Sequence, residues 1–96
     1  MLRGEIANAL TSARPGLIAT YREALSSRHY ARRTIATYER WLRRYLRFHQ
    51  LRHPREMRGP EINAFLTHLA VVEQVSASTQ NQALAALLFL YKRVLN

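Results

Sequence analysis

Cysteine and aspartate are both absent from this sequence of 96 residues, and its only acids are six glutamates. Without cysteine, the chain cannot form a disulfide, a thiolate metal site or a cysteine nucleophile, and a reducing compartment suits it. So few carboxylates leave little material for a paired-carboxylate active site or for an oxygen-ligand metal cage. The composition therefore argues against most classes of enzyme for this chain on its own.

Glycine, proline and long apolar runs are scarce as well. The sequence has three glycines and three prolines and shows no sustained two-residue alternation, which predicts an all-helical protein. Its longest apolar run, residues 83–91, is less than half of the roughly 20 residues that a membrane-spanning helix needs. Residues 1–13 lack the continuous apolar segment of a signal peptide. We therefore expect a soluble all-α protein without a membrane partner.

Apolar spacing divides the chain into a loosely ordered leader at residues 1–14 and one compact domain at residues 15–96. With 48% hydrophobic residues, a chain of this length builds one core and has no room for a second. Four helices are predicted in the domain, which makes it a compact four-helix bundle. They cover residues 17–27, residues 31–49, a segment opened by residues 59–61, and a segment that follows the polar cluster 76–82 and runs to the end.

The second and fourth helices supply most of the predicted core. Six residues of the second helix fall within an arc of about 120°, at 100° per residue. They are Ile35, Tyr38, Leu42, Tyr45, Leu46 and His49. The fourth helix is apolar nearly all round, as expected of the central member of a small bundle, and its Phe89 is expected to cover a neighbouring domain or protomer. Between the second and third helices, Pro54 predicts an ordered basic loop at residues 51–58.

Positive charge is concentrated in one part of the chain. Fifteen lysines and arginines give a formal net charge of +9 and a pI near 11.3, which indicates a polyanionic partner or an anionic membrane face. Residues 28–58 hold ten arginines and two glutamates, a net +8 of that total. Five arginines of the second helix lie within an arc of about 100° opposite the core residues, and we call them the arginine stripe. They are Arg33, Arg40, Arg43, Arg44 and Arg47.

The arginine stripe differs from an ordinary solvated face. Such a face mixes both signs, because opposite charges pair at three- and four-residue spacing, whereas this helix carries only Glu39, at the flank of the stripe. The negative charges of a phosphate backbone neutralise the mutual repulsion of five cations. The guanidinium group can also donate two hydrogen bonds to O6 and N7 of guanine. The stripe therefore predicts binding to nucleic acid.

The polar start of the fourth helix is a second candidate surface. Ser78, Thr79 and Gln82 point away from the apolar side of this helix, and the free N–H groups of a helix N-terminus attract phosphate. Gln82, and secondarily Asn81, is expected to pair with adenine in a major groove. The alternative interpretation of Ser76 and Ser78 is helix capping.

The histidines and tyrosines give no catalytic or metal site. His49 and His53 have the spacing of a helical metal pair, but Pro54 ends the helix and no third ligand is near. The five tyrosines fit helix packing, and none is flanked by a base that would activate it as a nucleophile. We expect no catalytic residue, metal, cofactor or small-molecule substrate for this chain.

Sequence strings in the helices carry a family resemblance. An L-x-x-x-Y pattern in the first helix is followed by T-I-A-T-Y at residues 34–38, by the helix that includes residues 61–69, and by S-T-Q-N-Q-A-L at residues 78–84. From about Leu17 to the end, this order resembles the N-terminal SAM-like, core-binding domain of the tyrosine recombinase (phage integrase) family. The longer strings R-F-H, L-R-H-P-R-E-M and A-S-T-Q-N-Q-A-L-A-A-L-L-F-L-Y resemble an integron integrase.

The resemblance implies a SAM-like bundle that forms one half of a clamp on a recombination core site. Its second and fourth helices face the major groove, so the resemblance adds Arg33, Thr34 and Thr37 to the DNA-facing positions and supports those at the start of the fourth helix. Its partners are core-site DNA and other recombinase protomers in the cytoplasm of a bacterium. In the family the catalytic domain follows this one, so we do not expect this chain to cleave DNA.

Two other functions fit the same composition. One is an interaction module whose basic face docks on an acidic protein or a neighbouring protomer, with Phe89 as an apolar anchor. The other is a free-standing helical transcription regulator, which would need a recognition helix after a tight turn. The cationic helix here is the second and is followed by a loop with Pro54, which favours the recombinase interpretation.

Overall fold

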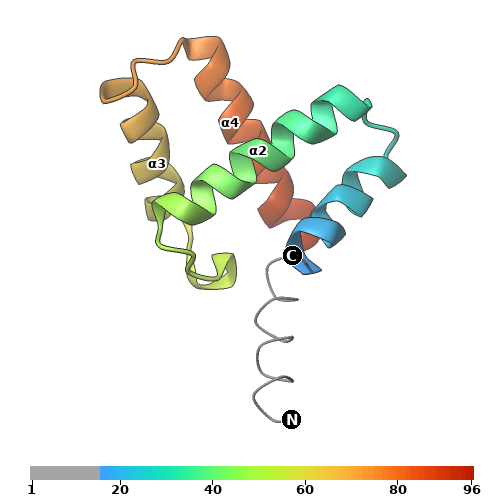
Figure 1. Ribbon diagram of the computed structural model, residues 1–96. Coiled ribbons are helices and arrows are strands. Elements are labelled where there is room, and N and C mark those ends of the chain that lie inside the picture. Colours follow the sequence, from blue (N-terminus) through green and yellow to red (C-terminus); the bar gives the residue numbers. More distant parts are fainter. Residues whose placement is uncertain (1–15) are drawn as a thin grey trace.

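The computed structural model describes residues 16–96, which fold into four α-helices (Figure 1). The first covers residues 16–27, and the others are α2 (Arg32–Phe48), α3 (Gly59–Val71) and α4 (Ala77–Phe89). A 3-10 turn, η1 (Pro54–Glu56), precedes α3, and a π-helical turn, η2 (Leu90–Val94), continues α4. The predicted four-helix fold is confirmed, while the predicted leader at residues 1–14 lies outside the described residues. None of the helices in the described range is both long and apolar enough to cross a bilayer.

Local hydrogen bonds cap the ends of the helices. After α2, the backbone of Leu51 is left-handed (φ 61°) and its N–H donates to the Leu46 carbonyl at 2.7 Å. At the start of α3, the N–H of Arg58 donates to the Glu61 carboxylate at 2.7 Å. The hydroxyl of Ser76 accepts from the N–H of a residue in the first turn of α4 at 3.1 Å, so Ser76 is the helix cap.

The fourth helix is the centre of the bundle, as predicted. It packs against both α2 and α3, and in Figure 1 it crosses behind α2, with α3 on one side and the 16–27 helix on the other. Ala83, Ala86 and Leu87 are fully buried along it. The Tyr21 hydroxyl donates to the Ala86 carbonyl at 2.8 Å, which ties the 16–27 helix to α4. The helices that carry the predicted binding surfaces are therefore held by one shared core.

The loop between α2 and α3 is ordered, as predicted, because it contributes to the core. Pro54 and Met57 are buried. The Tyr91 hydroxyl donates to the Pro54 carbonyl at 2.9 Å and lies 3.0 Å from the Tyr45 hydroxyl, so the loop, η2 and α2 share one hydrogen-bonded chain. Burial is the main cause that raises the pKa of both tyrosines above the ordinary value of 10.

The expectation that Phe89 covers a neighbouring domain or protomer is wrong. Its side chain is 7% exposed and packs inside the domain, with ring centroids 5.6 Å from both Tyr21 and Tyr30. The Arg28 guanidinium covers the ring at 5.7 Å from its centroid. The apparently free side of α4 is occupied because the 16–27 helix and the turn after it lie against the last turn of α4.

Candidate nucleic-acid interface

The outer face of α2 carries the arginine stripe. Trp41, Leu42, Tyr45 and Leu46 are buried on the inner face of this helix. The stripe arginines are exposed, except Arg44, whose side chain is 31% exposed. The predicted division of the helix into an apolar inner face and a cationic outer face is therefore confirmed, although the five arginines are not equivalent.

Arg43 is held in an ion pair that links α2 to the 16–27 helix. Its Nη2 lies 2.7 Å from Oε2 of Glu39, while Nη2 of Arg22 lies 2.7 Å from the other oxygen of the same carboxylate. Partial burial of Glu39 opposes its charged form, but hydrogen bonds from the two guanidinium groups outweigh this effect and lower the pKa of the carboxyl. Arg43 is thus partly neutralised within the domain.

The lowered pKa of Glu39 predicts that this link fails in acid. A carboxyl with a depressed folded pKa contributes stability above its unfolded value, 4.5, and the contribution is lost as the pH falls through the folded pKa. We expect Glu39→Gln to lower the unfolding free energy by about 1 kcal/mol at pH 7, and by progressively less as the pH falls below 4.5. Urea denaturation across this pH range measures the difference. Glu23→Gln is the control, because Glu23 is exposed and has no ion pair with a described residue; an equal effect there would contradict the assignment.

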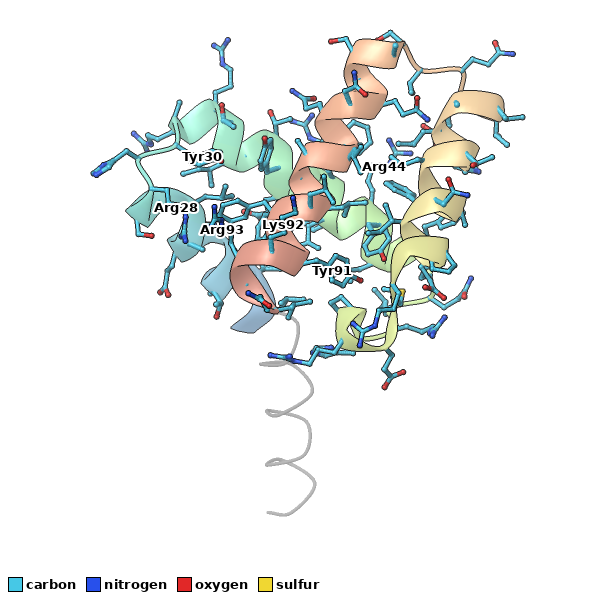
Figure 2. The ribbon with its side chains drawn as sticks, turned by 180° about the vertical axis from the view of Figure 1, so that it is seen from behind. Arg28, Tyr30, Arg44, Tyr91, Lys92 and Arg93 are labelled. Atoms are coloured by element: carbon cyan, nitrogen blue, oxygen red, sulfur yellow. The ribbon has the colours of Figure 1, made fainter. Side chains whose placement is uncertain are left out.

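Arg44 is a packing residue as much as a surface cation. Its guanidinium lies over the Trp41 ring, 5.2 Å from the centroid, and forms an ion pair with Glu73, just beyond α3. The same Glu73 oxygen lies 3.1 Å from Nε2 of His68. Figure 2 shows Arg44 between α3 and α4, seen from behind the molecule. Arg44 therefore connects α2 to the end of α3 and is the least available member of the stripe.

Arg33, Arg40 and Arg47 form the open part of the stripe. Each is exposed, and none forms an ion pair with a residue in the range 16–96. Arg32, which the sequence pattern did not single out, is also exposed and forms no ion pair with a residue of that range. It could have been found from its place at the start of α2, one residue before Arg33.

The two predicted surfaces lie next to each other. Both α2 and α4 begin on the upper side of the molecule in Figure 1. The Trp41 indole N–H of α2 donates to Oε1 of Gln82 in the second turn of α4 at 3.2 Å, which joins the two helices directly. Ser78 is exposed, whereas Thr34, Thr37 and Thr79 are half-buried. The positions named by the family resemblance therefore lie on two helices that are in direct contact.

Two histidines that resembled a metal pair have structural contacts. Nε2 of His49 lies 2.9 Å from the Glu61 carbonyl, and Nδ1 of His53 accepts from the backbone N–H of Arg55 at 3.1 Å. No group of three metal-ligating side chains occurs within residues 16–96. These contacts place both rings in the packing of the loop before α3.

A second cationic group was missed in the sequence, because its members are far apart along the chain. Figure 2 views the molecule with α4 in front of α2. In this view, Arg28, Lys92 and Arg93 lie close together. All three are exposed. This group lies apart from the arginine stripe and provides an internal reference for any test of which face binds a polyanion.

Comparison with known proteins identifies the family. Residues 17–96 match the family described as "Phage integrase, N-terminal SAM-like domain". The chain is 49% identical over 74 residues to proteins named "Integrase/recombinase" from Escherichia coli and from Pseudomonas aeruginosa. Each alignment covers 77% of this chain and 22% of the relative, so the chain spans about a fifth of the length of those proteins. The chain thus belongs to the phage integrase family, and the part of it that matches is the family's N-terminal SAM-like domain.

Proposed function

We propose that this domain binds duplex DNA as the N-terminal, core-binding module of a site-specific tyrosine recombinase. The observation that carries the proposal is the open part of the arginine stripe: Arg33, Arg40 and Arg47 are exposed on one helix face without an ion-pair partner in the described residues. A row of guanidinium groups without acidic partners in the described residues is complementary in charge to a phosphate backbone.

The start of α4 is proposed to enter the same binding surface. An α-helix fits the major groove, where side chains near a helix N-terminus reach base edges while neighbouring cations hold the phosphates. Arg33, Thr34 and Thr37 from α2 and Ser78, Thr79 and Gln82 from α4 are the proposed contacts. The direct contact between α2 and α4 supports a single footprint.

The proposed role of the chain is binding rather than chemistry. The relatives named integrase/recombinase are several times longer than this chain, and we assign DNA cleavage and joining to the catalytic part of such a full-length protein. The long strings at residues 47–57 and 77–91 favour an integron integrase within the family. DNA core sites and further recombinase protomers are the partners that this role requires.

One argument for the main alternative, docking on an acidic protein, no longer holds. It relied on Phe89 as an exposed apolar anchor, and Phe89 is buried against Tyr21 and Tyr30. The cationic face of α2 remains, and nuclease treatment of a pull-down would separate the two kinds of partner. DNA binding is therefore the function that the geometry favours.

Salt dependence tests the proposal directly. Each phosphate that is neutralised contributes about −0.9 to the slope of log affinity against log salt. Because Arg43 and Arg44 are already paired with glutamates, we expect a slope of about −3, rather than the −4 to −5 of five free arginines. Fluorescence anisotropy with a labelled core-site duplex, between about 50 and 200 mM salt, gives the slope. A slope near zero would contradict DNA binding through the stripe.

A further inference from the structure

The contact between Trp41 and Gln82 restricts what Gln82 can offer to a partner. Trp41 is 7% exposed, and its indole N–H donates to the Gln82 amide oxygen at 3.2 Å. An indole nitrogen can only donate, so the atom that faces it must be the amide oxygen whichever way an amide is assigned. The inward end of the Gln82 amide is therefore its acceptor.

The donor end of the same amide faces solvent. Gln82 is exposed, and its Nε2 makes no hydrogen bond with another described residue. Trp41 is itself held in place, since its ring packs against Phe65 at 6.4 Å between centroids and under the Arg44 guanidinium at 5.2 Å. Turning the amide over would leave a buried indole N–H facing another donor. The orientation with Nε2 outward is thus fixed by a rigid neighbour.

We propose that Trp41 holds the Gln82 amide with its oxygen inward and its NH₂ group toward the base edges, so that this domain prefers guanine over adenine at the base pair beneath the start of α4. The inference rests on the proposed function, because it requires α4 to face the major groove. Trp41 acts as a positioning residue and does not touch DNA itself.

The hydrogen-bonding pattern of the major groove gives the order of preference. Adenine presents an acceptor and a donor, so a glutamine that reads it uses its amide oxygen and nitrogen together. Guanine presents two adjacent acceptors, N7 and O6, which suit an NH₂ group alone, whereas cytosine presents a donor that an NH₂ group opposes. With its oxygen turned toward Trp41 and its NH₂ group outward, Gln82 matches guanine better than adenine and cytosine worst. The proposal thus differs from the adenine pairing that the sequence predicts.

Selection from a randomised duplex library tests this inference with the 96-residue chain. Bound duplexes are recovered at low salt and sequenced. We expect one position at which guanine exceeds adenine by about fivefold, a modest share of what a good base contact can discriminate. Trp41→Phe frees the amide oxygen and should bring adenine to parity with guanine or above it at that position. An unchanged guanine preference in Trp41→Phe would overturn the inference.

Two further variants separate orientation from stability. Gln82→Glu keeps an oxygen for the indole N–H and turns a second oxygen outward, so the preference should move from guanine to cytosine, whose amino group donates. Tyr21→Phe is the matched control, because it removes one buried hydrogen bond to α4, at Ala86, without touching Gln82. It should leave the base preference unchanged. If Trp41→Phe fails to fold, the guanine-to-cytosine change in Gln82→Glu still decides the question.

Failure of the inference can be distinguished from failure of the proposed function. If the wild-type chain retains no DNA even at low salt, the proposed function is wrong and the inference falls with it. If the chain binds with the expected salt slope, but adenine is preferred or no position responds to Gln82→Glu, DNA binding stands and the role of Trp41 and Gln82 is refuted.

Discussion

Reversing two charges on the outer face of α2 should weaken DNA binding by about 100-fold at 100 mM salt, because two phosphate contacts are lost and two repulsions replace them. The variant is Arg33→Glu with Arg40→Glu. Both residues belong to the open part of the stripe, with no ion-pair partner in the described residues. Thermal unfolding should barely change, since exposed substitutions of this kind alter stability by about 0.5 kcal/mol or less. A carboxylate at position 33 also lies in the first turn of α2, where the helix dipole favours it.

The matched control changes the net charge equally on the other side of the domain. Lys92→Glu with Arg93→Glu removes the same four units of charge from the group shown in Figure 2. If binding depends on the outer face of α2, the affinity of this control for DNA should fall severalfold at most. Equal losses in the two double variants would mean that net charge alone attracts DNA and would remove the assignment of a face. Anisotropy titrations of both variants under one salt condition measure the difference.

Arg44 is left out of the charge reversal for a structural reason. A carboxylate at that position would face Glu73 and lose the packing over the Trp41 ring. The variant would mix lost DNA contacts with lost stability, because a long arginine side chain also stabilises through its stem. Arg33 and Arg40 avoid this ambiguity.

The local architecture of the domain could be predicted because its causes are local. The predicted second helix, residues 31–49, is within one residue of α2 at each end. Leu42 and Tyr45 are fully buried, as their 100° spacing indicated. Pro54 and Gly59 mark the loop and the start of α3, because proline restricts the backbone that precedes it. Periodicity reports which face is buried without any knowledge of the partner.

The division of the site could be predicted only in part. Arg43 pairs with Glu39 at a local four-residue spacing, whereas the other contacts depend on partners far along the chain. Arg44 and Glu73 are in contact although they are 29 residues apart in the sequence, and Trp41 and Gln82 are 41 residues apart. A helical projection gives the angle of each side chain but not what lies opposite it. For the same reason, it placed Phe89 on a free surface that the 16–27 helix covers. The five-arginine stripe was therefore expected to be uniform, whereas three members are open and two are paired.

The centre of the bundle should be the position most sensitive to truncation. Leu87 is fully buried in α4, the helix that packs against both α2 and α3. We expect Leu87→Ala to lower the unfolding free energy by about 3 kcal/mol, since it removes apolar contacts and leaves a cavity that the neighbouring helices fill only partly. Such a loss is a large fraction of the roughly 5–15 kcal/mol that stabilises a typical domain. Urea denaturation followed by circular dichroism gives the value.

Leu88 provides the matched control, because the same substitution one residue later tests burial and not helix propensity. Its side chain is 37% exposed, so Leu88→Ala removes fewer contacts and should lower the unfolding free energy by about 1 kcal/mol or less. Both substitutions replace leucine with alanine in one helix, so any intrinsic gain in helix propensity is shared. The difference between the two variants then measures the packing of α4. A difference below about 1 kcal/mol would contradict the central position of this helix, and with it the rigid support that Trp41 and Gln82 require.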